Sequence, residues 1–361
     1  MVGVLLWVRH ETRMSELRAP LAPEHAGELV RLGVRLVVEE SADRTFPIEA
    51  YAAAGCAVAP AGSWPDAPVD AYVLGLKELP PRPYALVHRH VFFGHAYKSQ
   101  PGGSELLRRF TAGGGTLLDL EYAVDAAGRR IAAFGYWAGY VGANVAALHA
   151  YGRLGRPLVP GGRDAWDAAL VALGDTGRSA HERTSALVIG AAGRCGAGAC
   201  EALERAGIRA TRWGHDETQR LDRKALLAHD LLVNTIGTAT PVAPFVTKAD
   251  LDDPGRRLRL LCDVTCDVGS PCNAVPVYDR PTTWAEPVVR VHEGDPPLDV
   301  IALDNLPSLL PTESSRAFSA DLWPHLLTLR PDGPTGPAWV RSLDAFRRSL
   351  LRVPGSDSVG T

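Results

Sequence analysis

Residues 185–206 read SALVIGAAGRCGAGACEALERA, and this stretch decides the fold class. A buried-strand pattern runs into glycines at 190, 193 and 196, and a helical pattern follows over residues 199–206. A strand that turns on glycine into a helix points backbone N–H groups and the positive end of the helix dipole at one spot, which suits a pyrophosphate. The spacing is GxxGxxG instead of the commoner GxGxxG, so a purely structural tight turn is the alternative. The flanking strand and helix favour dinucleotide binding.

The strand predicted next along the chain ends where NAD-binding folds place an acidic residue for the 2′-hydroxyl of the adenosine ribose. The sequence at that place is Gly214, His215, Asp216 and Glu217. Asp216 can supply the acid slightly beyond the strand tip, whereas Arg212 and His215 would favour the 2′-phosphate of NADP. Both NAD and NADP therefore stay open as cofactors.

Working outward, the whole chain alternates strand-like and helix-like segments, which predicts parallel sheets covered by helices. A length of 361 residues suggests two domains of ordinary size. Around Gly135 the sequence changes to a helical stretch rich in glycine and alanine, which permits close helix packing. Strand-like segments occupy residues 4–8, 34–39, 73–77, 91–95 and 116–120 in the first half, and 185–189, 210–213, 230–236 and 257–264 in the second.

The composition is that of a soluble globular protein and excludes several classes. The formal net charge is -3, with 46% hydrophobic and 22% charged residues, so a polyanion-binding protein is not indicated. No apolar run is long enough to span a bilayer, and we expect a cytoplasmic protein without nucleic-acid or membrane partners. The six cysteines show neither a disulfide framework nor a CxxC pair, so we expect reduced thiols and no metal site.

Several rare residue combinations, in collinear order over essentially the whole chain, carry a family resemblance. They include Arg9-His-Glu-Thr12, Gly75-Leu-Lys-Glu-Leu-Pro80, His95-Ala-Tyr-Lys98, Gly193-Arg-Cys-Gly196 and Asp304-Asn-Leu-Pro-Ser-Leu-Leu-Pro311. With these motifs the chain resembles the lysine-forming saccharopine dehydrogenases, within the alanine dehydrogenase and transhydrogenase-like group. The resemblance implies an α/β fold of two Rossmann-like domains with parallel sheets flanking a cleft. Residues 1–135 with 314–361 would form the substrate domain, and residues 136–313 the dinucleotide-binding domain.

The resemblance also implies a reaction, the reversible NAD(P)-dependent oxidative deamination of saccharopine to L-lysine and 2-oxoglutarate. Hydride can leave the α-carbon only when the secondary amine is neutral, so the reaction needs a base, and a proton must reach the departing lysine nitrogen. Lys77 and His95 match the family's acid–base pair, and both fall at the ends of strand-like runs. An exposed lysine after a strand is commonplace, and this is the alternative interpretation of Lys77.

Further site residues follow from the same resemblance. Cationic side chains suit a substrate with three carboxylates, and nearby acidic groups can tune a lysine base or receive the amine end of the substrate. The substrate-binding residues implied are Arg18, Glu78, Lys98, Glu121 and Arg130. The cofactor-binding residues expected from the glycine turn and the resemblance are Gly190, Gly193, Arg194, Cys195, Gly196, Asp216, Asp263 and Asp304.

Two positions depart from the family pattern. Gly214 stands where the family has an aspartate after the tryptophan of the second cofactor-domain strand, which puts NAD preference in doubt. Asn305 replaces a histidine that lines the cleft in the family. Two alternatives therefore stay open: an opine-type imine reductase that joins a different amine to a 2-oxo acid, and a non-catalytic cofactor-binding sensor. For either enzyme, small-molecule substrates and a monomer or small homo-oligomer are expected.

Overall fold

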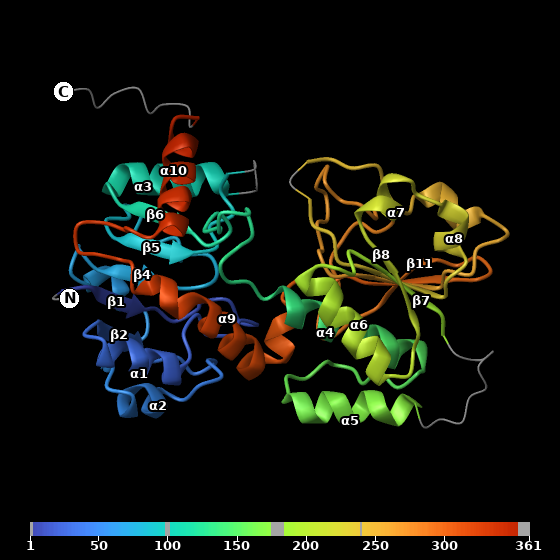
Figure 1. Cartoon of the computed structure of the whole chain (residues 1–361), viewed down its shortest axis with the longest axis horizontal. Coiled ribbons are helices and arrows are strands. Elements are labelled where there is room, and N and C mark those ends of the chain that lie inside the picture. The colour runs from blue at the N-terminus through green and yellow to red at the C-terminus, as the bar shows by residue number, and fades with distance from the viewer. Residues whose placement is uncertain (1–2, 98–101, 175–183, 239, 353–361) are drawn as a thin grey trace. The chain divides into compact units, whose positions relative to one another are not determined.

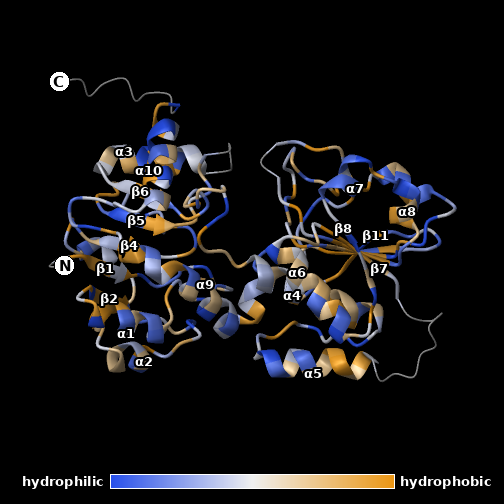
Figure 2. Cartoon of the chain, in the orientation of Figure 1, coloured by the Kyte–Doolittle hydropathy of each residue, from blue (hydrophilic) through white to orange (hydrophobic). Residues whose placement is uncertain are grey.

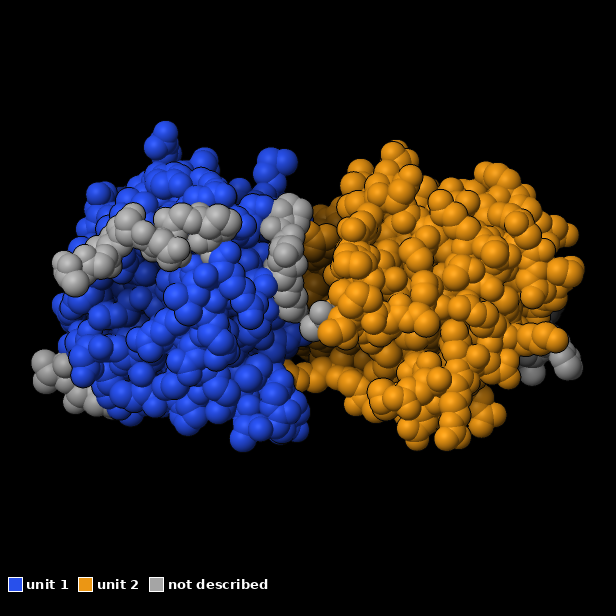
Figure 3. All heavy atoms as spheres, turned by 90° about the horizontal axis from the view of Figure 1, so that it is seen from above, with its two compact units in different colours: residues 1–133, 314–361 blue, residues 134–313 orange. Residues whose placement is uncertain are grey.

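The computed structural model describes residues 3–97, 102–174, 184–238 and 240–352. The chain divides into two compact units, which Figure 3 colours separately. Unit 1 comprises residues 1–133 and 314–361, and unit 2 comprises residues 134–313. Each unit is built around its own sheet, so the two are described in turn.

Unit 1 contains a six-stranded sheet in the order β3-β2-β1-β4-β5-β6, with every neighbouring pair parallel. This is a doubly wound order, in which the strand sequence reverses direction between β1 and β4. The strands are β1 (Leu5–Val8), β2 (Arg35–Glu39), β3 (Ala57–Ala59), β4 (Tyr72–Leu74), β5 (Arg89–Phe92) and β6 (Thr116–Asp119). The helices are α1 (Pro23–Arg31), α2 (Ile48–Ala53), α3 (Gly103–Gly113), α9 (Pro311–Leu326) and α10 (Pro337–Leu350), with a 3-10 turn η1 (Trp64–Asp66).

The C-terminal helix α10 completes unit 1 by packing on β6 and α3, beside which it lies in Figure 1. Its buried residues include Trp339 and Phe346. The Ser342 hydroxyl donates to the Asp119 carbonyl at 2.9 Å, which joins α10 to the end of β6. The last segment of the chain is therefore part of the core built by the first segment.

Unit 2 contains a second six-stranded sheet in the order β11-β12-β10-β9-β7-β8, parallel except for the antiparallel edge strand β11. Its strands are β7 (Ala186–Ile189), β8 (Ala210–Trp213), β9 (Leu231–Asn234), β10 (Leu260–Asp263), β11 (Val289–His292) and β12 (Leu298–Ile301). Its helices are α4 (Gly135–Ala150), α5 (Arg163–Gly174), α6 (Arg194–Arg205), α7 (His215–Gln219) and α8 (Arg223–Leu227), with 3-10 turns η2 (Lys248–Asp252) and η3 (Leu306–Leu309).

Helices α4 and α6 pack against each other through glycine, as the small residues of the sequence predict. A Cβ atom built on Gly139 would lie 1.8 Å from the Cys195 carbonyl oxygen, and one on Gly198 would lie 2.0 Å from the Tyr136 carbonyl oxygen. Only glycine lets the two backbones approach this closely, and the approach fixes α6 under the glycine turn.

The prediction of an α/β fold with two parallel-dominated sheets is confirmed, and the predicted strand positions agree apart from their ends. Strand β4 ends at Leu74 and β5 spans Arg89–Phe92, so Lys77 and His95 lie beyond the strands instead of inside the runs 73–77 and 91–95. Buried parallel strands are continuous apolar runs without a polar residue to mark their ends. Helix α6 begins at Arg194, earlier than the 199–206 pattern predicts, because Gly196 and Gly198 lie inside the helix.

The strands of both sheets carry strongly hydrophobic segments (Figure 2), and strands β4, β7, β9 and β10 are buried at every position. Among the described residues, no helix is both long and apolar enough to cross a membrane.

Candidate functional site

The carboxyl ends of β1, β4, β5 and β6 form a continuous edge in unit 1, since these four strands are neighbours in that order. In open α/β sheets, ligands bind beyond this edge and near the point where the strand order reverses. The predicted residues Lys77, His95 and Glu121 follow the ends of β4, β5 and β6.

Lys77 is held through its backbone by two buried residues that follow β1. The Glu11 carboxylate accepts the Leu76 N–H at 2.7 Å and the Lys77 N–H at 2.9 Å. The Arg9 guanidinium donates to the Lys77 carbonyl oxygen and lies 3.3 Å from Glu11. Sequence reasoning gave neither Arg9 nor Glu11 a role, although both stand in the quoted motif.

Glu39, at the end of β2, bonds the chain around the end of β1 and the segment after β3. Its side chain is fully buried at 0% exposure. Its carboxylate accepts the His10 N–H and the Trp7 indole N–H, both at 2.9 Å. It also accepts the Gly62 N–H at 2.9 Å and the Trp64 N–H at 2.6 Å. This carboxylate therefore ties the segment after β1 to the segment after β3.

Glu16 and Arg18 form a buried pair beside Lys77. Arg18 Nε lies 2.7 Å from Glu16 Oε1, and Arg18 Nη2 lies 2.6 Å from Oε2. Burial by itself raises the pKa of Glu16, but the charge and hydrogen bonds of Arg18, together with the charge of Lys77, outweigh it and hold that pKa below its ordinary value. The sequence prediction named Arg18 and Lys77 but missed Glu16, and the acid two residues before the predicted arginine was the available signal.

His95 and Glu121 meet at the other end of the same edge. His95 Nδ1 lies 3.7 Å from Glu121 Oε2, with side-chain exposures of 47% and 22%. His95 has a φ of 47°, a left-handed conformation that turns the chain sharply after β5, and its ring stacks on Phe93. The Glu121 N–H donates to Asp119 Oδ1 at 2.9 Å, which fixes the loop after β6.

Three further substrate-binding residues are predicted for unit 1, and the structure describes two of them. Glu78 follows Lys77 and is exposed. Arg130 is exposed and forms an isolated bridge with Val124. Lys98 lies outside the described residues. The structure thus brings His95 together with Glu121, and it places the Glu16–Arg18 pair within electrostatic range of Lys77.

The glycine turn of unit 2 has the form that a pyrophosphate requires. Gly190 has a φ of 83°, and the N–H groups of Gly190 and Ala191 donate to the Trp213 carbonyl at 2.9 and 3.1 Å. A Cβ atom on Gly196 would lie 2.2 Å from the Gly190 carbonyl oxygen. Residue 196 must therefore be glycine for the start of α6 to lie this close to the turn. Gly193 is the N-cap of α6 and makes no side-chain capping bond. The first N–H groups of a twelve-residue helix therefore suit an anionic group.

At the tip of β8, the acidic group beside the strand end is Glu217. Its carboxylate accepts the Gly214 N–H at 2.7 Å, and this backbone bond lowers the pKa of Glu217. A Cβ atom on Gly214 would lie 3.5 Å from Glu217 Oε2, so the carboxylate already lies next to the strand tip. Asp216, which the sequence prediction named, is an exposed residue of α7.

Asp263 is completely buried at the end of β10, with 0% exposure. Its carboxylate accepts from Asn234 Nδ2 at 3.0 Å, Thr265 Oγ1 at 2.7 Å and Tyr278 Oη at 2.5 Å. This bonding favours a role in holding the ends of β9 and β10 over direct contact with a cofactor. Asp304 is exposed.

Asn305, the departure from the family pattern, is 6% exposed and has a φ of 79° as the N-cap of η3.

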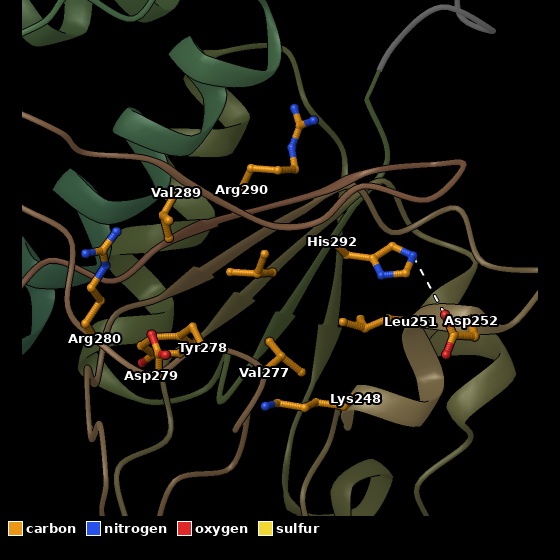
Figure 4. Close-up of a pocket in the computed structure, with 11 residues that line it drawn as sticks. Lys248, Leu251, Asp252, Val277, Tyr278, Asp279, Arg280, Val289, Arg290 and His292 are labelled. Atoms are coloured by element: carbon orange, nitrogen blue, oxygen red, sulfur yellow. Dashed lines mark ion pairs between the residues drawn. The ribbon is translucent and has the colours of Figure 1, made fainter.

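A pocket of about 540 Å³ lies elsewhere on unit 2, against β11. Figure 4 shows Lys248, Val277, Arg280 and His292 around it, with His292 directed toward Asp252. No predicted site residue among those the structure describes lines this pocket.

The fold defines the class, a chain of two α/β units with the alanine dehydrogenase type of fold. Residues 7–141 match the family model described as alanine dehydrogenase/PNT, N-terminal domain. A solved structure of L-alanine dehydrogenase superposes with a TM-score of 0.67 at 17% identity, covering 96% of this chain and 94% of that one. This likeness confirms the predicted fold.

Two curated relatives narrow the class to one family. The NAD(+), L-lysine-forming saccharopine dehydrogenase of Neurospora crassa is 40% identical over 369 residues, covering 99% of each chain. The enzyme of the same name from Schizosaccharomyces pombe is 40% identical over 375 residues, covering 98% of this chain and all of the relative. The chain belongs to the lysine-forming saccharopine dehydrogenase family, as its motifs predict.

Proposed function

We propose that this protein oxidises saccharopine with NAD⁺ and water to L-lysine, 2-oxoglutarate and NADH, in a reversible reaction. The observation that carries the proposal is the buried Glu16–Arg18 pair, which lies close enough to Lys77 for the lysine charge to lower the pKa of Glu16, in a chain similar to saccharopine dehydrogenases over nearly its full length. In this proposal unit 1 binds the amino-acid substrate and unit 2 binds the cofactor. The substrates are small molecules.

The residues of unit 2 fit a dinucleotide. The turn of Gly190, Gly193 and Gly196 and the start of α6, with Arg194 and Cys195, would hold the pyrophosphate. Glu217 at the tip of β8 would accept a hydrogen bond from the ribose 2′-hydroxyl, and its negative charge would oppose the 2′-phosphate of NADP. NAD is therefore the proposed cofactor, and when bound it accepts the hydride from the glutamyl α-carbon.

Lys77 acts as the base that keeps the secondary amine of saccharopine neutral and activates water for attack on the imine carbon. A carboxylate without a partner beside Lys77 would hold its ammonium permanently protonated. Arg18 pairs with Glu16 and offsets that effect, which leaves Lys77 able to exchange its proton.

His95 gives a proton to the departing lysine nitrogen, and Glu121 beside it orients the imidazole and stabilises its charged form. Arg130 binds a substrate carboxylate through its guanidinium fork, and Arg18 offers the guanidinium N–H groups that do not face Glu16, with Lys98 as a further cation. Glu78 and Glu121 are the acidic groups proposed for the amine end of the substrate.

The test is saccharopine oxidation by Lys77→Met and by His95→Gln. Each variant is expected to lower kcat by about 10²-fold to 10⁴-fold, because positioned acid–base groups contribute that much. NADH binding, followed by fluorescence titration, should stay unchanged, since both residues belong to unit 1. The matched control is Lys248→Met, which removes an exposed lysine of unit 2 and should retain wild-type turnover. Full activity in both site variants would contradict the mechanism.

A further inference from the structure

The backbone of Lys77 is bonded on both sides by one buried ion pair. Its N–H donates to Glu11 at 2.9 Å, and its carbonyl oxygen accepts from Arg9. The preceding N–H, that of Leu76, donates to the second carboxylate oxygen of Glu11 at 2.7 Å. Three consecutive peptide units, from Gly75 to Glu78, are therefore fixed by a pair that lies in a different segment of the chain.

This bonding begins just beyond the end of β4. The Arg9 N–H still donates to the Leu74 carbonyl at 3.0 Å, and the Gly75 N–H to the Val91 carbonyl at 3.0 Å. Toward β5, the Leu76 carbonyl still accepts the Phe93 N–H at 3.2 Å, whereas the N–H groups of Leu76 and Lys77 meet the segment that follows β1. The Glu11 carboxylate takes over as the acceptor for the next two N–H groups, so the segment that carries Lys77 stays ordered outside the sheet.

Stability alone does not explain the pair. Arg9 is 1% exposed and Glu11 is 9% exposed, and burying two charges costs enough that apolar side chains of similar size often stabilise a fold as well. The Arg9 guanidinium also occupies space that is open only because residue 75 is glycine. A Cβ atom on Gly75 would lie 2.4 Å from Arg9 Nε, and the guanidinium carbon lies 5.8 Å from the centre of the Phe92 ring.

We infer that Arg9 and Glu11 are positioning residues for the reaction, which fix the Cα atom of Lys77 so that its amine reaches the substrate. The inference rests on the proposed function, because it needs Lys77 as the base. A lysine side chain is a flexible four-carbon stem and places its amine poorly by itself. Fixing both peptide groups around its Cα atom removes the backbone part of that freedom.

The test is a double-mutant cycle between Glu11→Gln and Lys77→Met, measured in saccharopine oxidation. With Lys77 present, Glu11→Gln is expected to lower kcat by about 10-fold to 100-fold, since misplacement of a reacting group by about 1 Å has that effect. The KM for NAD⁺ should not change. When Lys77→Met is already in place, the same change should alter the residual rate by less than about twofold, because the two residues act through one group.

The pH profile supplies a readout that a merely structural role would not move. A Lys77 amine held farther from Glu16 gives up its proton more readily, so the acidic limb of kcat/KM should move to lower pH in Glu11→Gln. Arg9→Lys keeps the buried charge but loses the fork that reaches the Lys77 carbonyl. It should shift the profile in the same direction, and it serves as the second variant if Glu11→Gln does not fold.

The matched control is Asp230→Asn in unit 2, because Asp230 also accepts a backbone N–H, that of Ser185 at 2.9 Å. It should leave kcat and the pH profile at wild-type values. Equal loss from Glu11→Gln with and without the Lys77→Met change, together with an unmoved pH profile, would overturn the positioning role. Absence of saccharopine turnover in the wild type, or full turnover in Lys77→Met, would instead overturn the proposed function.

Discussion

At the scale of single residues, Glu217 and Gly214 decide how the tip of β8 meets a cofactor. A family aspartate is missing at Gly214, yet the Glu217 carboxylate lies 2.7 Å from the Gly214 nitrogen. The negative charge expected at this place in an NAD-binding fold is therefore present, supplied from the first turn of α7.

Glu217→Gln should reduce the preference for NAD⁺ over NADP⁺, measured as the ratio of kcat/KM values, by about tenfold or more, a change of about 1.4 kcal/mol. Glutamine keeps the bond to the Gly214 N–H because it also serves in a capping box, so only the charge is lost. Asp216→Asn is the control and should leave the ratio unchanged. If Asp216→Asn alone lowers the ratio, the acid belongs at Asp216, as the sequence analysis predicts.

Sequence alone could indicate the site residues that stand in distinctive motifs. The roles of these residues stay predictions. Lys77 and His95 could be found because they stand in rare combinations after strand-like runs. Glu16 was missed, because its spacing from Arg18 was the one sequence signal and their pairing depends on an irregular loop that no periodicity describes. Asp263 was found as a strand-end acid, but its buried bonding to Tyr278 could be seen only in three dimensions.

At the scale of elements, the close packing of α4 against α6 can be tested by substitution of a glycine. Gly198→Ala should destabilise the protein by about 1–3 kcal/mol, because the added carbon meets the Tyr136 carbonyl oxygen and the core has no room to shift. Chemical unfolding measures the loss. Alanine is normally the better helix former by about 1 kcal/mol, so any loss reports the packing.

The control for this prediction is Gly174→Ala in α5, where an added Cβ meets no atom within 4 Å. It should be neutral or slightly stabilising. Equal stability of Gly198→Ala and Gly174→Ala would contradict the close approach of the two helices.

A second test at this scale concerns His90 in strand β5 and the pH dependence of stability. His90 is fully buried among the rings of Trp64, Phe92 and Phe110, and this burial, reinforced by the positive charge of Arg9, keeps the pKa of His90 well below its ordinary value of 6.5. The unfolded chain therefore binds a proton at this residue before the folded chain does. Stability is unaffected above about pH 6.5 and falls as the pH drops below it, by at most about 1.4 kcal/mol per pH unit.

His90→Phe should remove this part of the acid sensitivity, measured by chemical unfolding at neutral pH and at lower pH values. The exposed His215→Asn is the control and should keep the wild-type pH dependence. The same pH dependence in His90→Phe as in the wild type would show that His90 is not held neutral.

The positions of most strands and helices could be predicted from apolar runs and glycine turns, but the short edge elements could not. Strand β3 has three residues, two of them exposed, and α2 has six, so neither shows a clear period. The edge strand β11 pairs antiparallel to β12 with an irregular register, which a pattern of repeated strand and helix does not indicate.

At the scale of the whole molecule, the two units have separate hydrophobic cores, and unit 1 depends on both ends of the chain. Truncation after Gly333 removes α10 with its buried Trp339 and Phe346. We expect loss of saccharopine turnover, because the carboxyl edge of β6 loses its support. NADH binding by unit 2 should persist. Retained turnover, or loss of NADH binding together with turnover, would contradict the assignment of separate roles to the two units.

The central claim is that this chain joins L-lysine to 2-oxoglutarate, and the reductive reaction tests it most directly. Purified protein is mixed with 2-oxoglutarate, NADH or NADPH, and lysine, ornithine, arginine or no amine, and followed by absorbance and product mass. The account predicts oxidation of NADH with lysine alone and a product with the mass of saccharopine. Turnover with another amine and not with lysine, or no turnover despite NADH binding, would contradict it.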